Sequence, residues 1–192
     1  MSRRPYRMAK RADGAAATRR RILEATMAVN DQQGIVGTSV RDVAGRAGVS
    51  PATVLRHFPA MGDLTEACGR LSDELYPMPT QSVLDGANGP TDGLRRVAAA
   101  FFGWWAEYGP GWSHLEIDRR ELPQVDGWLR NVEAVRRGLI AKALGRRVDV
   151  AEVALVTALT SHGAWQSLSD SGMSPEEAAT EVARFVMRGD AP

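Results

Sequence analysis

The stretch that covers residues 38–58, TSVRDVAGRAGVSPATVLRHF, constrains the fold more than any other part of the chain. It predicts two short helices that are joined by one tight turn. Ser39 and Asp42 have capping-box spacing at the start of the first helix, and apolar residues follow them at helical intervals. Gly48 suits the turn, because a left-handed backbone costs glycine little.

The second helix begins at residue 51, since Ser50 is a good N-cap and Pro51 fits the first helical position. Val54 and Phe58 are predicted to face the core. The other side chains surround the start and the outer side of a helix too short to fold on its own, and such a helix fits the major groove of DNA. The candidate DNA-contacting residues are Thr38, Ser39, Arg41, Arg46, Ser50, Pro51, Ala52, Thr53, Leu55, Arg56 and His57.

Together with the preceding TRRRILEATMAV, residues 38–64 resemble the DNA-binding domain of the tetracycline-repressor (TetR) family of bacterial transcription regulators. The TSVRDVA segment, the AGVS turn and the RHF ending follow the order and spacing of that family, over about residues 15–75. The chain departs from the pattern at Asn30, where many members have an aromatic residue. It also has Leu55 in place of a tyrosine in the recognition helix and Met61 in place of a phosphate-binding lysine.

The resemblance implies a sequence-specific DNA-binding regulator, and most often a repressor that a small-molecule effector releases from a palindromic operator. It places Arg56 and His57 at phosphate- and base-contacting positions, and Thr53 offers a hydroxyl donor at the same end. Leu55 can contact a thymine methyl. The expected partners are therefore double-stranded operator DNA, an effector and a second copy of the chain.

The charge distribution favours the same function. Residues 1–70 carry 12 Lys and Arg against 6 Asp and Glu, whereas residues 71–192 carry 12 against 17. A basic N-terminal segment joined to an acidic C-terminal one is expected if the N-terminal segment binds DNA phosphates. Attraction to phosphate is the main sequence-independent part of DNA affinity.

The chain is predicted to be all-α, with an N-terminal three-helix helix-turn-helix DNA-binding domain followed by a larger helical ligand-binding and dimerisation domain. The predicted parts are a flexible basic arm at residues 1–14, the DNA-binding domain at residues 15–75 and the larger domain at residues 76–192. The first helix is expected from Thr18 to about Gly34. The basic residues of the arm are Arg3, Arg4, Arg7, Lys10 and Arg11.

Beyond the DNA-binding domain, residues 76–92 are rich in Pro, Gly, Asn and Asp and indicate a linker. Apolar spacing and breakers then predict helices at residues 94–108, 112–118 and 123–144. One long helix is expected from Asp149 to Gly172.

The last helix begins with a capping box formed by Ser174 and Glu177, and Val182, Phe185 and Val186 are predicted to form its buried face. By resemblance, the last two long helices pair with those of a partner in a four-helix bundle. The alternative is that they only complete the monomer core. The predicted interface residues are Val153, Val156, Leu159, Val182, Phe185 and Val186.

All five tryptophans lie after residue 100, and they favour an apolar ligand pocket in the second domain. For any single tryptophan, a place in the core is the simpler interpretation. The predicted ligand-binding residues are Trp104, Tyr108, Trp112, His114, Trp128, His162 and Trp165.

Two other functions are considered. A small helical enzyme would use His114, Glu116 and Asp118 as metal ligands or as an acid–base set, but no nucleophile motif or phosphate loop accompanies them. A ligand-independent architectural DNA-binding protein would not need a large aromatic body. The chain is therefore predicted not to be an enzyme.

No apolar run is long enough to span a bilayer and no signal peptide is evident, so the protein is expected to be cytoplasmic. Its single cysteine, Cys68, excludes an internal disulfide and is expected to be a small core residue. No cofactor or metal is predicted.

Overall fold

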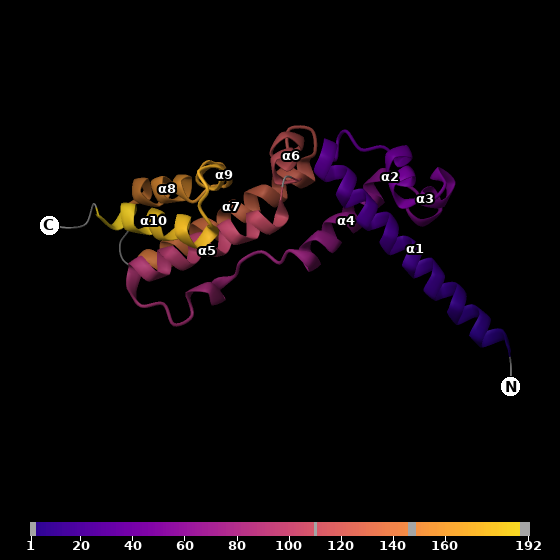
Figure 1. Cartoon of the computed structure of the whole chain (residues 1–192), viewed down its shortest axis with the longest axis horizontal. Helices are drawn as coiled ribbons and strands as arrows, with labels where there is room; N and C mark the ends of the chain where they lie inside the picture. The colour runs from indigo at the N-terminus through magenta and orange to yellow at the C-terminus, as the bar shows by residue number, and fades with distance from the viewer. Residues whose placement is uncertain (1–2, 110, 146–148, 189–192) are drawn as a thin grey trace. The chain divides into compact units, whose positions relative to one another are not determined.

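The computed structural model describes residues 3–109, 111–145 and 149–188, and in these ranges every regular element is a helix (Figure 1). The predicted all-α class is confirmed. The helices form two compact units. The first unit contains α1 (Arg3–Gln33), α2 (Val40–Ala47), α3 (Pro51–His57), α4 (Met61–Leu75) and α6 (Gly111–Asp118). The second contains η1 (Gln81–Leu84), α5 (Gly89–Tyr108), α7 (Pro123–Leu144), α8 (Val150–Leu159), α9 (His162–Asp170) and α10 (Pro175–Arg188).

The core of the first unit lies where α1 to α4 meet. Ile22 from α1, Val43 from α2 and Val54 from α3 are completely buried, and Phe58 is 2% exposed. Leu64 from α4 joins them, and Cys68 is buried, as predicted. Apart from Phe58, which directly follows α3, each residue comes from the apolar stripe of its own helix, so the periodicity of the sequence predicts most of this core.

The start of α4 is capped by a route that local sequence patterns did not indicate. No Ser, Thr, Asp or Asn precedes Met61, but Asp63 accepts a hydrogen bond from the backbone N–H of Ala60 at 3.0 Å. One of the N–H groups at the start of this helix is therefore satisfied from inside its first turn.

Helix α6 belongs to the first unit, although the surrounding sequence belongs to the second. Asp118, at the end of α6, is 6% exposed and accepts the backbone N–H of Ile35 at 2.6 Å. Gly34 precedes that N–H with φ +79°, and a Cβ added to it would lie 3.0 Å from both carboxylate oxygens of Asp118. The buried carboxylate therefore holds α6 against the end of α1, at a position that only glycine accommodates.

The second unit is built around α5, which packs against α7 and α10. Leu94, Val97, Phe101 and Phe102 are completely buried. Helix α5 begins at Gly89, inside the predicted linker, which also contains η1. The linker prediction was therefore too long, because Asn88 and Pro90 begin a helix here rather than extend a loop.

The single long helix predicted after Asp149 is wrong. The structure has two helices, α8 and α9, with a break at Thr160 and Ser161. Buried Arg136 of α7 donates to the carbonyl of Thr157, which a continuous helix would offer to the N–H of residue 161. That N–H instead donates to Ala158 at 3.1 Å. Ser161 then caps α9 by accepting the N–H of Ala164 at 3.2 Å.

The capping box of the last helix is confirmed, because Ser174 and Glu177 exchange both hydrogen bonds. The predicted buried face is only partly right: Val182 is 7% exposed and Val186 is half-buried, but the Phe185 side chain is 67% exposed. Helix α1 begins at Arg3, well before the predicted Thr18. The side chains of the predicted basic arm up to residue 12 lie outside the described residues. None of the described helices is both long and apolar enough to cross a membrane.

Candidate nucleic-acid interface

The turn between α2 and α3 has the conformation that the sequence predicts. Gly48 adopts φ 64° and ψ 38°, and the N–H of Val49 donates to the carbonyl of Ala44 at 3.0 Å. The capping box of α2 is complete, with the N–H of Ser39 donating to Asp42 at 3.1 Å. The hydroxyl of Ser39 and then its backbone N–H lower the pKa of the Asp42 carboxyl by hydrogen bonding. Both ends of α2 are therefore fixed locally.

The N-terminal end of α3 is organised by Ser50 and Thr53. The Ser50 hydroxyl accepts the backbone N–H of Thr53 at 3.2 Å, and the two hydroxyl oxygens are 3.0 Å apart. Pro51 follows at the first helical position. Val54 faces the core at 0% exposure, so the opposite side of α3 faces outward.

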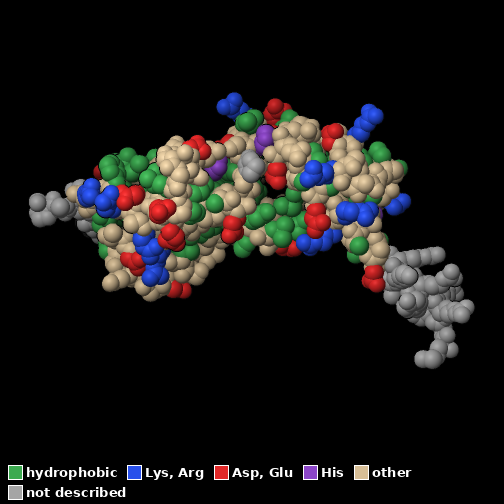
Figure 2. All heavy atoms as spheres, viewed as in Figure 1, with side chains coloured by type: hydrophobic (Ala, Val, Ile, Leu, Met, Phe, Trp, Pro, Cys, Tyr) green, Lys and Arg blue, Asp and Glu red, His purple; other side chains and the backbone are tan. Residues whose placement is uncertain are grey.

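The outward side of these two helices carries most of the predicted DNA-contacting residues. Leu55 is 44% exposed on α3, while Thr53 and His57 are half-buried. Figure 2 shows Lys and Arg side chains around α2 and α3. The remaining exposed members of the predicted set are Ser39, Arg41, Arg46, Ser50, Pro51, Ala52 and Arg56.

Thr38 differs from the rest of the set. It is 8% exposed, and its hydroxyl lies 2.8 Å from the Asn30 side-chain oxygen and 2.6 Å from the Gly34 carbonyl. The side chain therefore fixes the approach to α2 from inside the unit. Asn30, which replaces an aromatic residue of the family pattern, serves as a polar partner of Thr38.

Arg19 is a contributor that the sequence interpretation missed. From α1 it donates to the carbonyl of His57 at 3.0 Å, and its guanidinium lies 4.1 Å from the centre of the Phe58 ring. It thereby satisfies a carbonyl at the end of α3. No local signal identifies this residue, because its partner lies 38 positions away in the sequence.

The predicted ligand-binding residues are divided between the two units. Trp112 and His114 lie on α6 in the first unit, where the Trp112 Nε1–H donates to Glu116 at 3.2 Å. In the second unit, ring centres of Trp104, Tyr108 and Trp128 lie 5.7 to 6.1 Å apart.

A second aromatic group in the same unit contains Trp105, His162 and Trp165. His162 is 5.7 Å from the Trp105 ring, and Trp165 stacks on Phe102 at 5.5 Å. Burial lowers the pKa of His162 to about 4, so its imidazole is neutral at pH 7. Arg136 lies 5.5 Å from the Trp105 ring.

The three residues of the alternative catalytic set, His114, Glu116 and Asp118, interact with neighbouring residues of the first unit. Asp118 binds the Ile35 N–H, and Glu116 contacts Trp112 and Arg119. Burial raises the pKa of the Asp31 carboxyl, and the electrostatic effect of the nearby His114 lowers it in part. Among the described residues, no three His, Cys, Asp or Glu side chains come together as a metal-binding group.

Residues 22–68 match the family model of bacterial regulatory proteins of the tetR family. The matched range contains α2 and α3, together with parts of α1 and α4. A comparison with curated proteins finds no match.

Solved structures of regulators share the fold along nearly the whole chain. A transcriptional regulator from Rhodococcus sp. Rha1 is 21% identical, with a TM-score of 0.64, over 89% of this chain and 96% of that one. The TetR-family transcriptional regulator PfmR from Thermus thermophilus is 21% identical, with a TM-score of 0.61, over 89% and 99%. The ketosteroid transcriptional regulator KstR2 of Mycobacterium tuberculosis is 18% identical, with a TM-score of 0.64, over 89% and 93%.

Proposed function

The helix-turn-helix domain of this chain belongs to the tetR family of bacterial regulatory proteins, and from this premise we propose that the chain is a repressor that binds a palindromic operator as a homodimer. A small-molecule effector that binds the second unit releases it from DNA. The main support for DNA binding is that Leu55 and Arg56 are exposed on the outward side of α3. This helix is held in place by the Ser50 cap at its start and by the hydrogen bond from Arg19 at its end.

The exposed residues divide into two roles. Arg56, Arg41 and Arg46 supply charge-assisted contacts to phosphates, which position the protein on the duplex. Thr53 and Leu55 lie toward base edges, where a hydroxyl can donate or accept and an apolar side chain can contact a thymine methyl. A helix as short as α3 reads few base pairs, so a symmetric second copy is needed for a specific site.

The dimer is supported by apolar side chains that one chain leaves uncovered. Leu155 of α8 is 61% exposed and Phe185 of α10 is 67% exposed. Hydrophobic side chains are also visible at the surface over α8 in Figure 2. Val156 and Val182 belong to the monomer core, whereas Val153, Leu159 and Val186 are half-buried at its edge.

The proposed effector site is the aromatic part of the second unit. Trp104, Tyr108 and Trp128 contact one another, and Trp165 and His162 lie in the neighbouring group, which Trp105 joins to Trp104. Aromatic surfaces with a few polar groups are typical of sites for small ligands. An effector releases DNA only if it binds the released state more tightly than the DNA-bound state.

The decisive experiment measures binding to a cognate and a scrambled duplex at two salt concentrations. We expect Arg56→Ala to weaken binding to both duplexes and to reduce the slope of log K against log salt by about 0.9. Thr53→Ala should cost about 1–3 kcal/mol on the cognate duplex and little on the scrambled one. Arg70→Ala, which removes an exposed arginine paired with Glu66 on α4, is the matched control and should change neither.

Equal affinity of the unmodified protein for both duplexes would overturn the repressor proposal and favour an architectural DNA-binding protein. If Thr53→Ala lowers the affinity for both duplexes equally, Thr53 does not contact a base edge. These results do not depend on knowing the effector, because all binding curves are measured without it.

A further inference from the structure

A groove of about 520 Å³ lies within the second unit, between the start of α5 and the end of α10. Its volume falls in the range of sites for small organic ligands, roughly 300–1,000 Å³. The aromatic residues of the proposed effector site are not among its lining residues. The groove is lined by Asn88, Thr91, Asp92, Arg95, Thr180, Ala183, Arg184, Met187 and Arg188.

The lining combines apolar surface with guanidinium groups. Ala183 and Met187 come from successive turns of α10 and supply the apolar part. Arg184 and Arg188 come from the same two turns, and Arg95 faces them from α5. Three of the lining residues are cationic and one, Asp92, is anionic.

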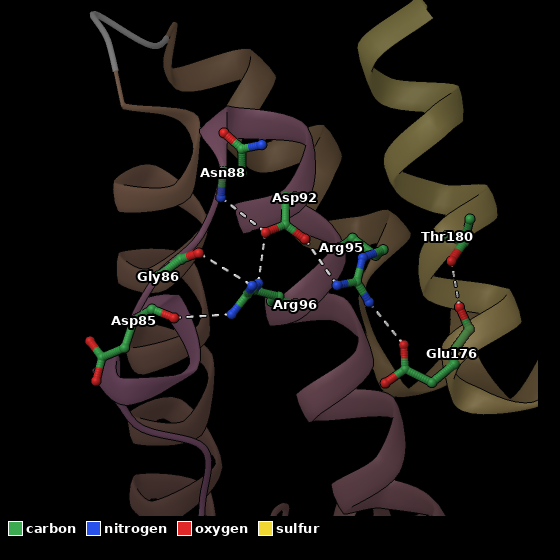
Figure 3. A network of polar contacts seen from close by, with 8 residues as sticks. All are labelled: Asp85, Gly86, Asn88, Asp92, Arg95, Arg96, Glu176 and Thr180. Atoms are coloured by element: carbon green, nitrogen blue, oxygen red, sulfur yellow. Dashed lines mark hydrogen bonds and ion pairs between the residues drawn. The ribbon is translucent and has the colours of Figure 1, made fainter.

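The single carboxylate is already neutralised by its own helix. Figure 3 shows Asp92 between Arg95 and Arg96, with hydrogen bonds of 2.9 Å and 2.8 Å, and it also accepts the backbone N–H of Asn88 at 3.0 Å. The N–H of Asn88 and then Arg95 lower the pKa of Asp92 to about 2. Asp92 is therefore directed at the arginines of its own helix, and the charged side chains that line the opposite wall are the guanidiniums of Arg184 and Arg188.

One arginine on each wall is also held by an ion pair with a residue outside the groove. Arg95 is held by Glu176 of α10 at 3.0 Å, and Arg184 is paired with Glu181. Glu176 and Glu181 do not line the groove. Paired guanidiniums keep donors for a further anion, because each carries five N–H groups in a planar fork.

Most of the α10 residues that line the groove lie on a different face of the helix from Phe185 of the proposed dimer surface. Along α10, residues 180, 183, 184 and 187 follow the spacing of one helical face. Phe185 lies about 150° around the helix from the middle of that face, at 100° per residue. Arg188, three positions after Phe185, lies only about 60° from it, so a partner chain that covers Phe185 approaches the groove at Arg188 and not at the other four lining residues of α10.

We propose that this groove is a second small-molecule site, which binds an organic anion with an apolar tail, of the medium-chain carboxylate class. The carboxylate head pairs with Arg184 and Arg188, since guanidinium and carboxylate match in bidentate geometry. The tail covers Met187 and Ala183. This site is distinct from the aromatic site of the proposed repressor function and does not depend on it.

Decanoate below its micelle concentration is the probe, titrated by calorimetry into the full chain without DNA. We expect one decanoate per chain, and the double variant Arg184→Gln, Arg188→Gln should bind it about tenfold or more weakly. Met187→Glu should abolish binding, because it replaces the apolar surface under the tail with a charged carboxylate. Arg130→Gln removes an exposed arginine of α7 that is paired with Asp126 outside the groove, and it should leave the affinity unchanged.

Two further titrations test the role of the carboxylate head and the location of the site. Decanol tests the head group and should bind at least tenfold more weakly than decanoate. Trp128→Ala tests the aromatic site and should leave decanoate binding unchanged. Absence of binding, equal binding of decanol, or loss of binding in Trp128→Ala with none in the groove variants would each overturn the proposal. None of these outcomes affects the operator-binding test.

Discussion

Arg19 connects α1 to the end of α3 through two different parts of one guanidinium. An N–H edge donates to the His57 carbonyl, while the face of the group covers the Phe58 ring. A charge-assisted bond to a helix-terminal carbonyl and a cation–π contact act on the same segment. The position of α3 on the core therefore depends on a residue that is not part of the predicted DNA-contacting set.

Arg19→Ala should lower the free energy of unfolding by about 1–3 kcal/mol, because the His57 carbonyl loses its donor and the Phe58 ring loses its cover. Urea unfolding followed by circular dichroism measures this loss. The neighbouring Arg20→Ala is the control: Arg20 pairs with Glu24 in an exposed i,i+4 bridge, so less than about 0.5 kcal/mol is expected. Equal losses for the two variants would show that Arg19 has no special role.

At this scale the sequence identifies residues whose partners are local. The capping pairs Ser39 with Asp42 and Ser174 with Glu177 are confirmed, since both partners stand three positions apart. Asp118 was assigned only to an alternative catalytic set. Its partner, the Ile35 N–H, is 83 positions away, and no pattern in the chain predicts such a contact.

Helix α2 contains Gly45 and is followed by Gly48, and a side chain is tolerated at the first position but strained at the second. Gly45 is an exposed interior helical residue, and a Cβ there would meet nothing within 4 Å. Gly48 also has open space but has φ +64°. The difference between them is therefore backbone conformation alone.

Gly45→Ala should raise the free energy of unfolding by about 0.5–1 kcal/mol, because alanine loses less backbone freedom in a helix. Gly48→Ala should lower it by about 1–2 kcal/mol, because a left-handed backbone strains any residue with a Cβ. The two variants serve as each other's control in one thermal or urea unfolding series. Changes of the same sign would contradict this account of the turn.

The elements that were predicted well are those whose ends are encoded nearby. The segments at residues 112–118 and 123–144 appear as α6 and α7, since Gly and Pro mark their limits. The α8–α9 break was missed because its main cause, Arg136, lies on another helix. A guanidinium that takes a helical carbonyl from outside leaves no signal in the sequence of the helix that it interrupts.

The dimer is tested by changing only residues that one chain leaves exposed. Leu155→Glu together with Phe185→Glu should convert a dimer to a monomer at micromolar concentration, because a charge would be buried without a partner at each site. Light scattering gives the mass, and circular dichroism checks that helix content is unchanged. Val36→Glu, at another exposed apolar residue in the first unit, should remain dimeric. A dimer that survives the double change would exclude this surface.

The position of α6 has a consequence for how the protein is made. The chain completes α4 at Leu75, builds α5, and only then supplies the α6 residues that belong to the first unit. During synthesis, the Ile35 N–H therefore has no Asp118 partner until roughly 40 further residues have been added after α4. At about 5–20 residues per second, this takes seconds. The DNA-binding unit becomes complete only after part of the second unit has emerged, so synthesis of the two units is interleaved rather than sequential.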